Sequence, residues 1–277
     1  MLTFVVALHC EAKPIIDGYK LKKVADKPFD LYRVDQGGDQ IELVVTGIGA
    51  LSVASAVGWV AGRDCSMSEQ RVWLNVGTAG HANRDLGNIV LAHGVGDEVQ
   101  QRSHYPPLVA KWQGKTDAIL SVSAPTSNYP LGAAVDMEAY AFFNVAIRFS
   151  DSELVQSLKV ISDNEQSGIE HLNAKKLTEL VQQNINQIQL FAQSLNSIKP
   201  QKLNVNYALL SHLTGTHSQR LQAHELLARV SALVSDSDFK IKDLKESLEM
   251  LSQLKEALPV LRDCVDSITP SMVRQHG

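Results

Sequence analysis

Short, continuous apolar runs recur through the first two thirds of the chain. Runs of this length and continuity are typical of strands that are buried on both faces of a sheet. Two of them are separated by an Asp- and Gly-rich stretch that suits a hairpin loop. The predicted strands are 2–8, 29–34, 40–45, 72–76, 86–92, 118–122 and 158–161.

Helical patterns lie between and after these runs. Pro14 is suited to begin a helix after the first strand. Residues 50–61 are rich in small side chains, so a helix there could pack closely against a sheet. Residues 172–197 carry apolar side chains at helical spacing and would cover the sheet. Strands that alternate with helices predict an α/β protein.

The pattern changes near the Ile-Lys-Pro-Gln stretch at 198–201, which breaks the preceding helix. After about residue 202 strand signals are almost absent and amphipathic helices follow. The predicted helices are 207–213, 221–234 and 239–258, with a break at 236–238. We therefore expect a first domain at 1–198 and a helical C-terminal extension at 199–277, which is an appendage or an oligomer contact.

Composition narrows the class of protein. The chain has 277 residues, 44% hydrophobic and 20% charged, which is ordinary for a globular protein with a substantial core. Its net charge of −4 gives no sign of a nucleic-acid-binding surface. Three widely spaced cysteines without a CxxC pair argue against a disulfide framework and fit a reducing compartment. Residues 2–8 are too short to span a bilayer, so we expect a cytoplasmic protein without a membrane partner.

Several predicted strands end in glycines or acids. Glu11 follows the first strand and Asp163 follows the last. Gly47 lies in the Thr-Gly-Ile-Gly turn at 46–49, and 77–81 is expected to be a glycine-bracketed turn. In open α/β sheets ligands bind beyond the carboxyl ends of strands, so together these ends predict one ligand-binding edge. Singly, Glu11 would more often be a solvated loop acid, and Asp163 suits a helix N-cap.

Residues 135–143 place two acids, Asp136 and Glu138, in an apolar run. An ionised carboxylate is costly to bury unless it is hydrogen-bonded or paired. Either Asp136 caps a helix and Glu138 lies on its solvated face, or Glu138 projects into a pocket and accepts hydrogen bonds from a ligand. The acids at the other strand ends favour the pocket for Glu138 and leave Asp136 a structural role.

Two common kinds of site find no support. His81, His93 and His104 lack the close helical spacing of a zinc pair, so we expect no metal. The turn at 46–49 does not extend into a dinucleotide fingerprint, because Ser52 stands where the third glycine belongs. No cofactor is therefore expected.

Four stretches of the chain follow the order of a known family's motifs. They are Ala-Leu-His-Cys-Glu-Ala at 7–12, Thr-Gly-Ile-Gly at 46–49, Asn-Val-Gly-Thr-Ala-Gly at 75–80, and Val-Asp-Met-Glu-Ala at 135–139 followed by Ile-Ser-Asp at 161–163. In these residues the chain resembles the purine nucleoside phosphorylase and nucleosidase superfamily. It is most similar to the methylthioadenosine/S-adenosylhomocysteine nucleosidase and futalosine hydrolase branch. The resemblance covers roughly residues 1–195 and leaves the helical tail outside.

The resemblance implies a three-layer α/β/α sandwich with a mixed, partly barrel-like central sheet, here with a C-terminal helical appendage. Asp163 would protonate the departing base, Glu11 would activate the attacking water, and Glu138 would bind the ribose hydroxyls. The remaining residues expected to bind substrate are Met137, Thr78, Ala79, Gly80, Ser162 and, through its turn, Gly47. The family usually forms dimers or larger rings, so we expect a homodimer or larger homo-oligomer.

The implied function is hydrolysis of the N-ribosidic bond of a purine-type or 5′-modified nucleoside. Phosphorylases of the superfamily hold phosphate with arginines, but Asn75 and the loop around Glu11 occupy those positions here, which favours water. A phosphate-dependent nucleoside phosphorylase and a non-catalytic nucleoside-binding protein are the alternatives. Residues 107–131 form a short stretch where the family has substrate-contacting loops and a base-stacking aromatic, so the base and 5′-group stay open. Lys159 stands where nucleosidases often have arginine, as a partner of the site or a strand-edge residue.

Overall fold

A computed structural model gives the structure of the protein and describes all residues except 38, 64–70, 199–206, 234–238 and 269–277. The chain forms two compact units, Met1–Lys199 and Pro200–Gly277. Across the described ranges, every helix is too short or too polar to serve as a membrane span.

Unit 1 is built on one mixed sheet, whose order is β10-β6-β8-β9-β5-β1-β4-β3-β2, with β7 paired to β6. Its strands are β1 (Leu2–Val6), β2 (Lys22–Ala25), β3 (Asp30–Gln36), β4 (Asp39–Val45), β5 (Val72–His81), β6 (Ile89–Asp97), β7 (Ser103–His104), β8 (Lys115–Ser121), β9 (Ala133–Asp136) and β10 (Val155–Asp163). Because β10 also pairs with β5, the strands β5, β10, β6, β8 and β9 close into a barrel. Strands β1, β4, β3 and β2 extend from β5 as an open sheet. The predicted mixed, partly barrel-like sheet is thus confirmed.

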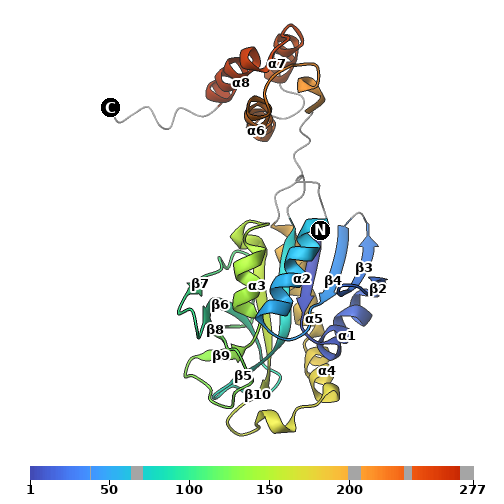
Figure 1. Ribbon diagram of the computed structural model, residues 1–277, viewed down its shortest axis with the longest axis vertical. Coiled ribbons are helices and arrows are strands. Elements are labelled where there is room, and N and C mark those ends of the chain that lie inside the picture. Colours follow the sequence, from blue (N-terminus) through green and yellow to red (C-terminus); the bar gives the residue numbers. More distant parts are fainter. Residues whose placement is uncertain (38, 64–70, 199–206, 234–238, 269–277) are drawn as a thin grey trace, which may run out of the picture. The chain divides into compact units, whose positions relative to one another are not determined.

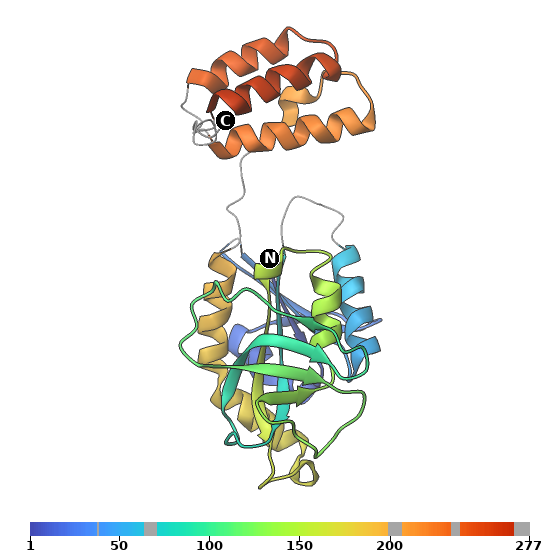
Figure 2. The same cartoon turned by 90° about the vertical axis from the view of Figure 1, so that its left-hand side faces the viewer.

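Helices cover both faces of this sheet (Figures 1 and 2). One layer consists of α1 (His9–Tyr19), α4 (Ala174–Gln183) and α5 (Ile185–Ser197), whose apolar faces share a core with the sheet. The opposite layer consists of α2 (Ala50–Arg63) and α3 (Ala139–Ala146), which pack in a second core. Small residues let α2 approach the sheet, since Val53, Ala56 and Val57 are fully buried. The predicted three-layer α/β/α sandwich is confirmed.

Unit 2 is helical in its described part. It contains the short 3-10 helix η3 (Tyr207–Leu210) and the helices α6 (His217–Leu233), α7 (Phe239–Glu249) and α8 (Leu254–Ile268). Leucines from all of these elements form its own hydrophobic core. The prediction of a single helix at 239–258 is wrong, because residues 250–253 leave the helix and Ser252 O accepts the Thr214 amide instead. The predicted break at 198–201 begins at Ile198, directly after the end of α5, and its other residues lie outside the described part of the chain, as does the whole predicted break at 236–238.

Three predictions about unit 1 are corrected by its hydrogen bonds. Residues 77–81 are not a turn, because β5 continues through them to pair with β10 and β9. The strand expected at 86–92 begins only at Ile89, since the Gly87 amide turns back to Ile161 O. The helix expected at 172–197 is two helices that meet at Asn184.

The start of α1 also differs from the prediction. The helix begins at His9, and Pro14 lies inside it. The early start is explained by Glu11. Its carboxylate accepts the backbone N–H of Leu8, the N-cap residue, and so stabilises the beginning of the helix.

Candidate active site

A split in the sheet creates the candidate site. Strand β10 pairs with β5 along almost its whole length, so β1 and β9 must share the opposite edge of β5. The β1 ladder ends at Asn75 and the β9 ladder begins at Gly80. Between them, the backbone N–H of Thr78 has no strand partner on that edge and donates to Glu11. Strands that diverge in this way leave room for a ligand.

A cavity of about 260 Å³ lies at this split. This volume is just below the range of roughly 300–1,000 Å³ that is usual for small-molecule sites. Four carboxylates contribute to its wall, Glu11, Asp136, Glu138 and Asp163, and much of the rest is apolar. The larger apolar side chains around it include Leu8, Ile48, Val122, Ile169, Leu172 and Leu177. Within the described parts of the chain, no lysine, arginine or histidine lines the cavity.

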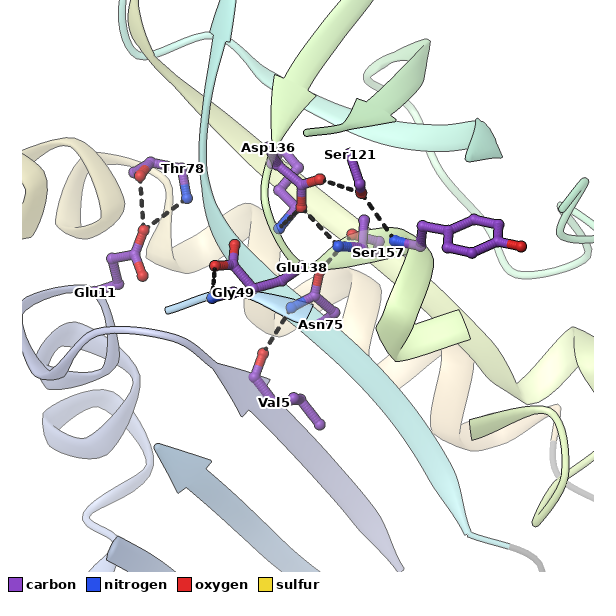
Figure 3. A network of polar contacts seen from close by, with 12 residues as sticks. Val5, Glu11, Gly49, Asn75, Thr78, Ser121, Asp136, Glu138 and Ser157 are labelled. Atoms are coloured by element: carbon purple, nitrogen blue, oxygen red, sulfur yellow. Dashed lines mark hydrogen bonds and ion pairs between the residues drawn. The ribbon is translucent and has the colours of Figure 1, made fainter. Parts of the chain in front are cut away.

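Glu11 is held rigidly although it stands at the start of a helix. Its Oε1 accepts hydrogen bonds from the backbone N–H of Thr78 (2.8 Å) and from the Thr78 hydroxyl (2.7 Å). Its Oε2 accepts the backbone N–H of Leu8 (3.1 Å). The side chain is almost completely buried, and Figure 3 shows it reaching from α1 to β5. These three donors satisfy a buried carboxylate and fix it at the cavity.

Asp136, the last residue of β9, fixes the turn into α3. Its Oδ1 accepts the Ser121 hydroxyl (2.6 Å), and its Oδ2 accepts the Ala139 N–H (2.8 Å) (Figure 3). The Lys159 ammonium group lies 2.8 Å from the same Oδ2. Burial alone would lower the pKa of Lys159, but Asp136 and the neighbouring carboxylates raise it, so the buried side chain stays charged. Asp136 and Lys159 therefore form a buried ion pair beneath the cavity.

Glu138 lies two residues farther on, where α3 begins. Its Oε1 accepts the backbone N–H of Gly49 at 2.7 Å, which ties α3 to the loop before α2 (Figure 3). Burial raises its pKa from 4.5 to about 7, and the negative charge of Asp136 adds to the rise. Lys159 and the Gly49 amide act in the opposite direction. Glu138 thus changes charge near neutral pH, unlike an exposed glutamate.

Asp163 ends β10 and is held by side chains. Its Oδ1 accepts the Ser162 hydroxyl (2.5 Å), and its Oδ2 accepts the Tyr129 hydroxyl (2.6 Å). Gly80 packs against Tyr129 and Asp163, the two residues joined by the second of these hydrogen bonds. A Cβ at Gly80 would lie 2.4 Å from Tyr129 Cε1 and 2.5 Å from Asp163 Oδ2, so only glycine fits at this position of β5.

The structure brings most of the predicted site residues to this cavity. Its lining includes Glu11, Thr78, Ala79, Gly80, Met137, Glu138, Ser162 and Asp163. Gly47 is outside the lining, and its N–H donates to Ala7 O within the backbone of the turn. The amide that reaches a site carboxylate belongs to the second glycine of that turn, Gly49. Sequence reasoning missed Gly49 and Tyr129, and neither has a local signal beyond a glycine turn and a proline-rich stretch.

Solved structures with the same fold confirm the predicted resemblance at the level of the fold. A 5′-methylthioadenosine/S-adenosylhomocysteine nucleosidase from Colwellia psychrerythraea, in complex with adenine, has a TM-score of 0.56 and 17% sequence identity, over 72% of this chain and 95% of that chain. The 5′-methylthioadenosine nucleosidase of Arabidopsis thaliana gives 0.56 and 15%, over 70% and 95%. The futalosine hydrolase of Helicobacter pylori gives 0.54 and 13%, over 69% and 97%. No protein-family model and no curated protein sequence matches the chain.

Proposed function

We propose that the chain is a nucleosidase that hydrolyses the N-ribosidic bond of a purine-type or 5′-modified nucleoside. The observation that carries the proposal is the meeting of Glu11, Glu138 and Asp163 around one small, largely apolar cavity. Each of these carboxylates is held by donors of the protein, and together they direct acidic groups toward one cavity, which is an arrangement typical of a functional site. A nucleoside suits them, because it offers hydroxyl donors at the ribose and a basic nitrogen at the base.

In the proposed reaction the bond between ribose C1′ and the base nitrogen breaks. Asp163 gives its proton to a nitrogen of the departing base, so the base leaves as a neutral molecule. The oxygen of water bonds to C1′, and a proton of this water passes to Glu11. Free base and ribose are released, and proton exchange with solvent resets both carboxyl groups. Each positioned acid or base contributes about 10²–10⁴-fold to the rate in reactions of this kind.

Glu138 supplies the ribose site in this proposal. In its ionised form it can accept hydrogen bonds from the ribose hydroxyls and stabilise the positive charge that grows on the sugar as the base departs. Met137 would pack against the sugar face, and Thr78, Ala79 and Gly80 would form the floor. Ser162 would help to hold Asp163, to which it donates a hydrogen bond.

Water is favoured over phosphate as the acceptor. A phosphate dianion is normally held by arginine or lysine in a forked or close contact. The side chains described around this cavity include none of these cations, and Lys159 is occupied by Asp136. The acidic wall of the cavity therefore offers a phosphate dianion no free cation among the described side chains.

The structural neighbours give independent support for the substrate class. One nucleosidase of this fold was solved with adenine, and those of Streptococcus pneumoniae and Neisseria meningitidis were solved with methylthio-immucillin-A inhibitors. We infer a purine-type nucleoside for this chain from these likenesses in fold together with its own cavity.

A nucleoside panel in phosphate-free buffer, read by release of free base, tests the proposal. We expect wild-type chain to release base and free ribose, and Asp163→Asn to lose about 10²–10⁴-fold of this activity. Glu165→Gln, at an exposed acid two residues away, is the matched control and should retain it. Ribose 1-phosphate formed only when phosphate is added would show a phosphorylase. Binding without cleavage across the panel would show a nucleoside-binding protein.

A further inference from the structure

Tyr129 is the aromatic residue at the Asp163 end of the cavity. It lies in the irregular stretch between β8 and β9, and its ring is buried in a small cluster with Ala82, Val122 and Val135. The ring also lines the cavity, next to Gly80. Its position is therefore fixed by packing and does not depend on a ligand.

The hydroxyl of Tyr129 is aimed at Asp163. It donates a hydrogen bond of 2.6 Å to Asp163 Oδ2, and both groups are nearly inaccessible to solvent. Among the described residues, Tyr129 is the only side chain of 123–131 that hydrogen-bonds outside this stretch. Burial and the negative charge of Asp163 both raise the pKa of Tyr129 above its ordinary value. Tyr129 therefore keeps its proton and remains the donor across the neutral pH range.

We propose that Tyr129 is a positioning residue for Asp163, which it makes a stronger proton donor to the departing base. The inference rests on the proposed nucleosidase function and adds a partner to its acid. When Asp163 gives up its proton, a carboxylate remains in a buried site, and the Tyr129 hydroxyl stabilises it. The bond also fixes the direction of the carboxyl group, which Ser162 holds from the other oxygen.

The geometry of Gly80 supports this arrangement. The glycine lets the tyrosine ring and the carboxylate approach the backbone of β5 together, closer than any other residue would allow. A hydrogen bond to a charged group of this kind is worth roughly 10- to 100-fold in an equilibrium or rate. We therefore expect Tyr129 to contribute about that factor to the cleavage of substrates that need an acid.

Tyr129→Phe is the sharpest test, because it removes the hydroxyl and keeps the ring. Nucleosides need protonation of the base, whereas p-nitrophenyl riboside releases a good leaving group without it. We expect Tyr129→Phe to lower kcat on nucleosides about 10- to 100-fold, and to leave kcat on p-nitrophenyl riboside within about 3-fold of wild type. Asp163→Asn should show the same split with a larger loss. Tyr105→Phe, at a tyrosine that is 78% exposed, is the matched control and should change neither rate.

Equal losses on both substrates would show that Tyr129 only supports packing, and an unchanged rate on nucleosides would also overturn the inference. Failure of the proposed function gives a different result, because wild-type chain would then cleave no nucleoside at all. In that case urea unfolding still tests whether Tyr129 and Asp163 interact. Tyr129→Phe and Asp163→Asn should be non-additive in stability if the two groups interact as described, and additive effects would refute the pairing.

Discussion

Glu138 should make the chain less stable as the pH rises. Burial raises its pKa from 4.5 to about 7, so the folded chain holds this proton more tightly than the unfolded chain does. Between these two values the unfolded chain has lost the proton while the folded chain keeps it, and the folded state loses stability with each step up in pH. Glu138→Gln removes the titrating group and keeps an oxygen that can accept the Gly49 amide.

The size of the effect follows from the two pKa values of Glu138, 4.5 in the unfolded chain and about 7 in the folded chain. At about 1.4 kcal/mol per unit, the full effect is roughly 3 kcal/mol, of which roughly 2.5 kcal/mol appears between about pH 5 and pH 8. Relative to Glu138→Gln, wild-type chain should therefore lose about 2.5 kcal/mol of unfolding free energy over this interval. Effects of all other groups cancel in the difference, as long as the replacement leaves their surroundings unchanged.

Urea unfolding followed by tryptophan fluorescence suits this measurement. All three tryptophans, Trp59, Trp73 and Trp112, belong to unit 1, so the signal reports the unit that holds the site. Glu165→Gln controls for the loss of a carboxylate at an exposed position. A difference between wild type and Glu138→Gln that is equal at both pH values, or that changes with the opposite sign, would refute the assignment of a raised pKa to burial.

Three further outcomes are expected. Lys159 lowers the pKa of Glu138, and the proposed function needs ionised Glu138 to bind ribose. Lys159→Met should therefore move the acid limb of kcat/KM from near pH 7 to higher pH, and an unmoved limb would contradict this. Gly80→Ala should lower kcat on nucleosides about tenfold or more, because the new Cβ overlaps the acid and its partner; Gly58→Ala, with open space around it, should not. Leu248→Asp places a charge in the buried core of unit 2. It should reduce helical circular dichroism and leave the fluorescence-detected unfolding of unit 1 unchanged, and a shift in both would show that the units unfold together.

The elements that sequence patterns predicted well are those whose signals are local. The hairpin strands β3 and β4 and the helix α2 appear close to their predicted places. The predicted strand ended at residue 76, because the glycines that follow are typical of a turn. In the structure these glycines continue β5 and pair with β10, some 80 residues later in the chain. Similarly, the break at 250–253 comes from pairing with Thr214, a contact that no helical pattern contains.

The candidate site shows the same division. Glu11 and Asp163 could be expected at one edge, because each follows a predicted strand. Glu138 could be expected there only from its place in an apolar run and from the resemblance, since no strand was predicted directly before it. Tyr129 could not, since it lies 34 residues from Asp163 in a stretch without periodicity. The buried pairing of Lys159 with Asp136 was also out of reach, because strand alternation alone does not say which charged groups meet inside a barrel.

The donors that hold the carboxylates determine how freely the residues around the site can be substituted. Main-chain amides of Leu8, Thr78, Gly49 and Ala139 bind three of the four acids. A main-chain donor survives almost any replacement of its own side chain, so these parts of the site constrain the backbone path more than the residue types around them. Asp163 is different, because among the described residues its hydrogen-bond donors are two hydroxyl side chains, those of Tyr129 and Ser162. Under the proposed reaction this is the end of the cavity that holds the departing base, so substitutions that alter leaving-group preference should concentrate there and change the sugar end little.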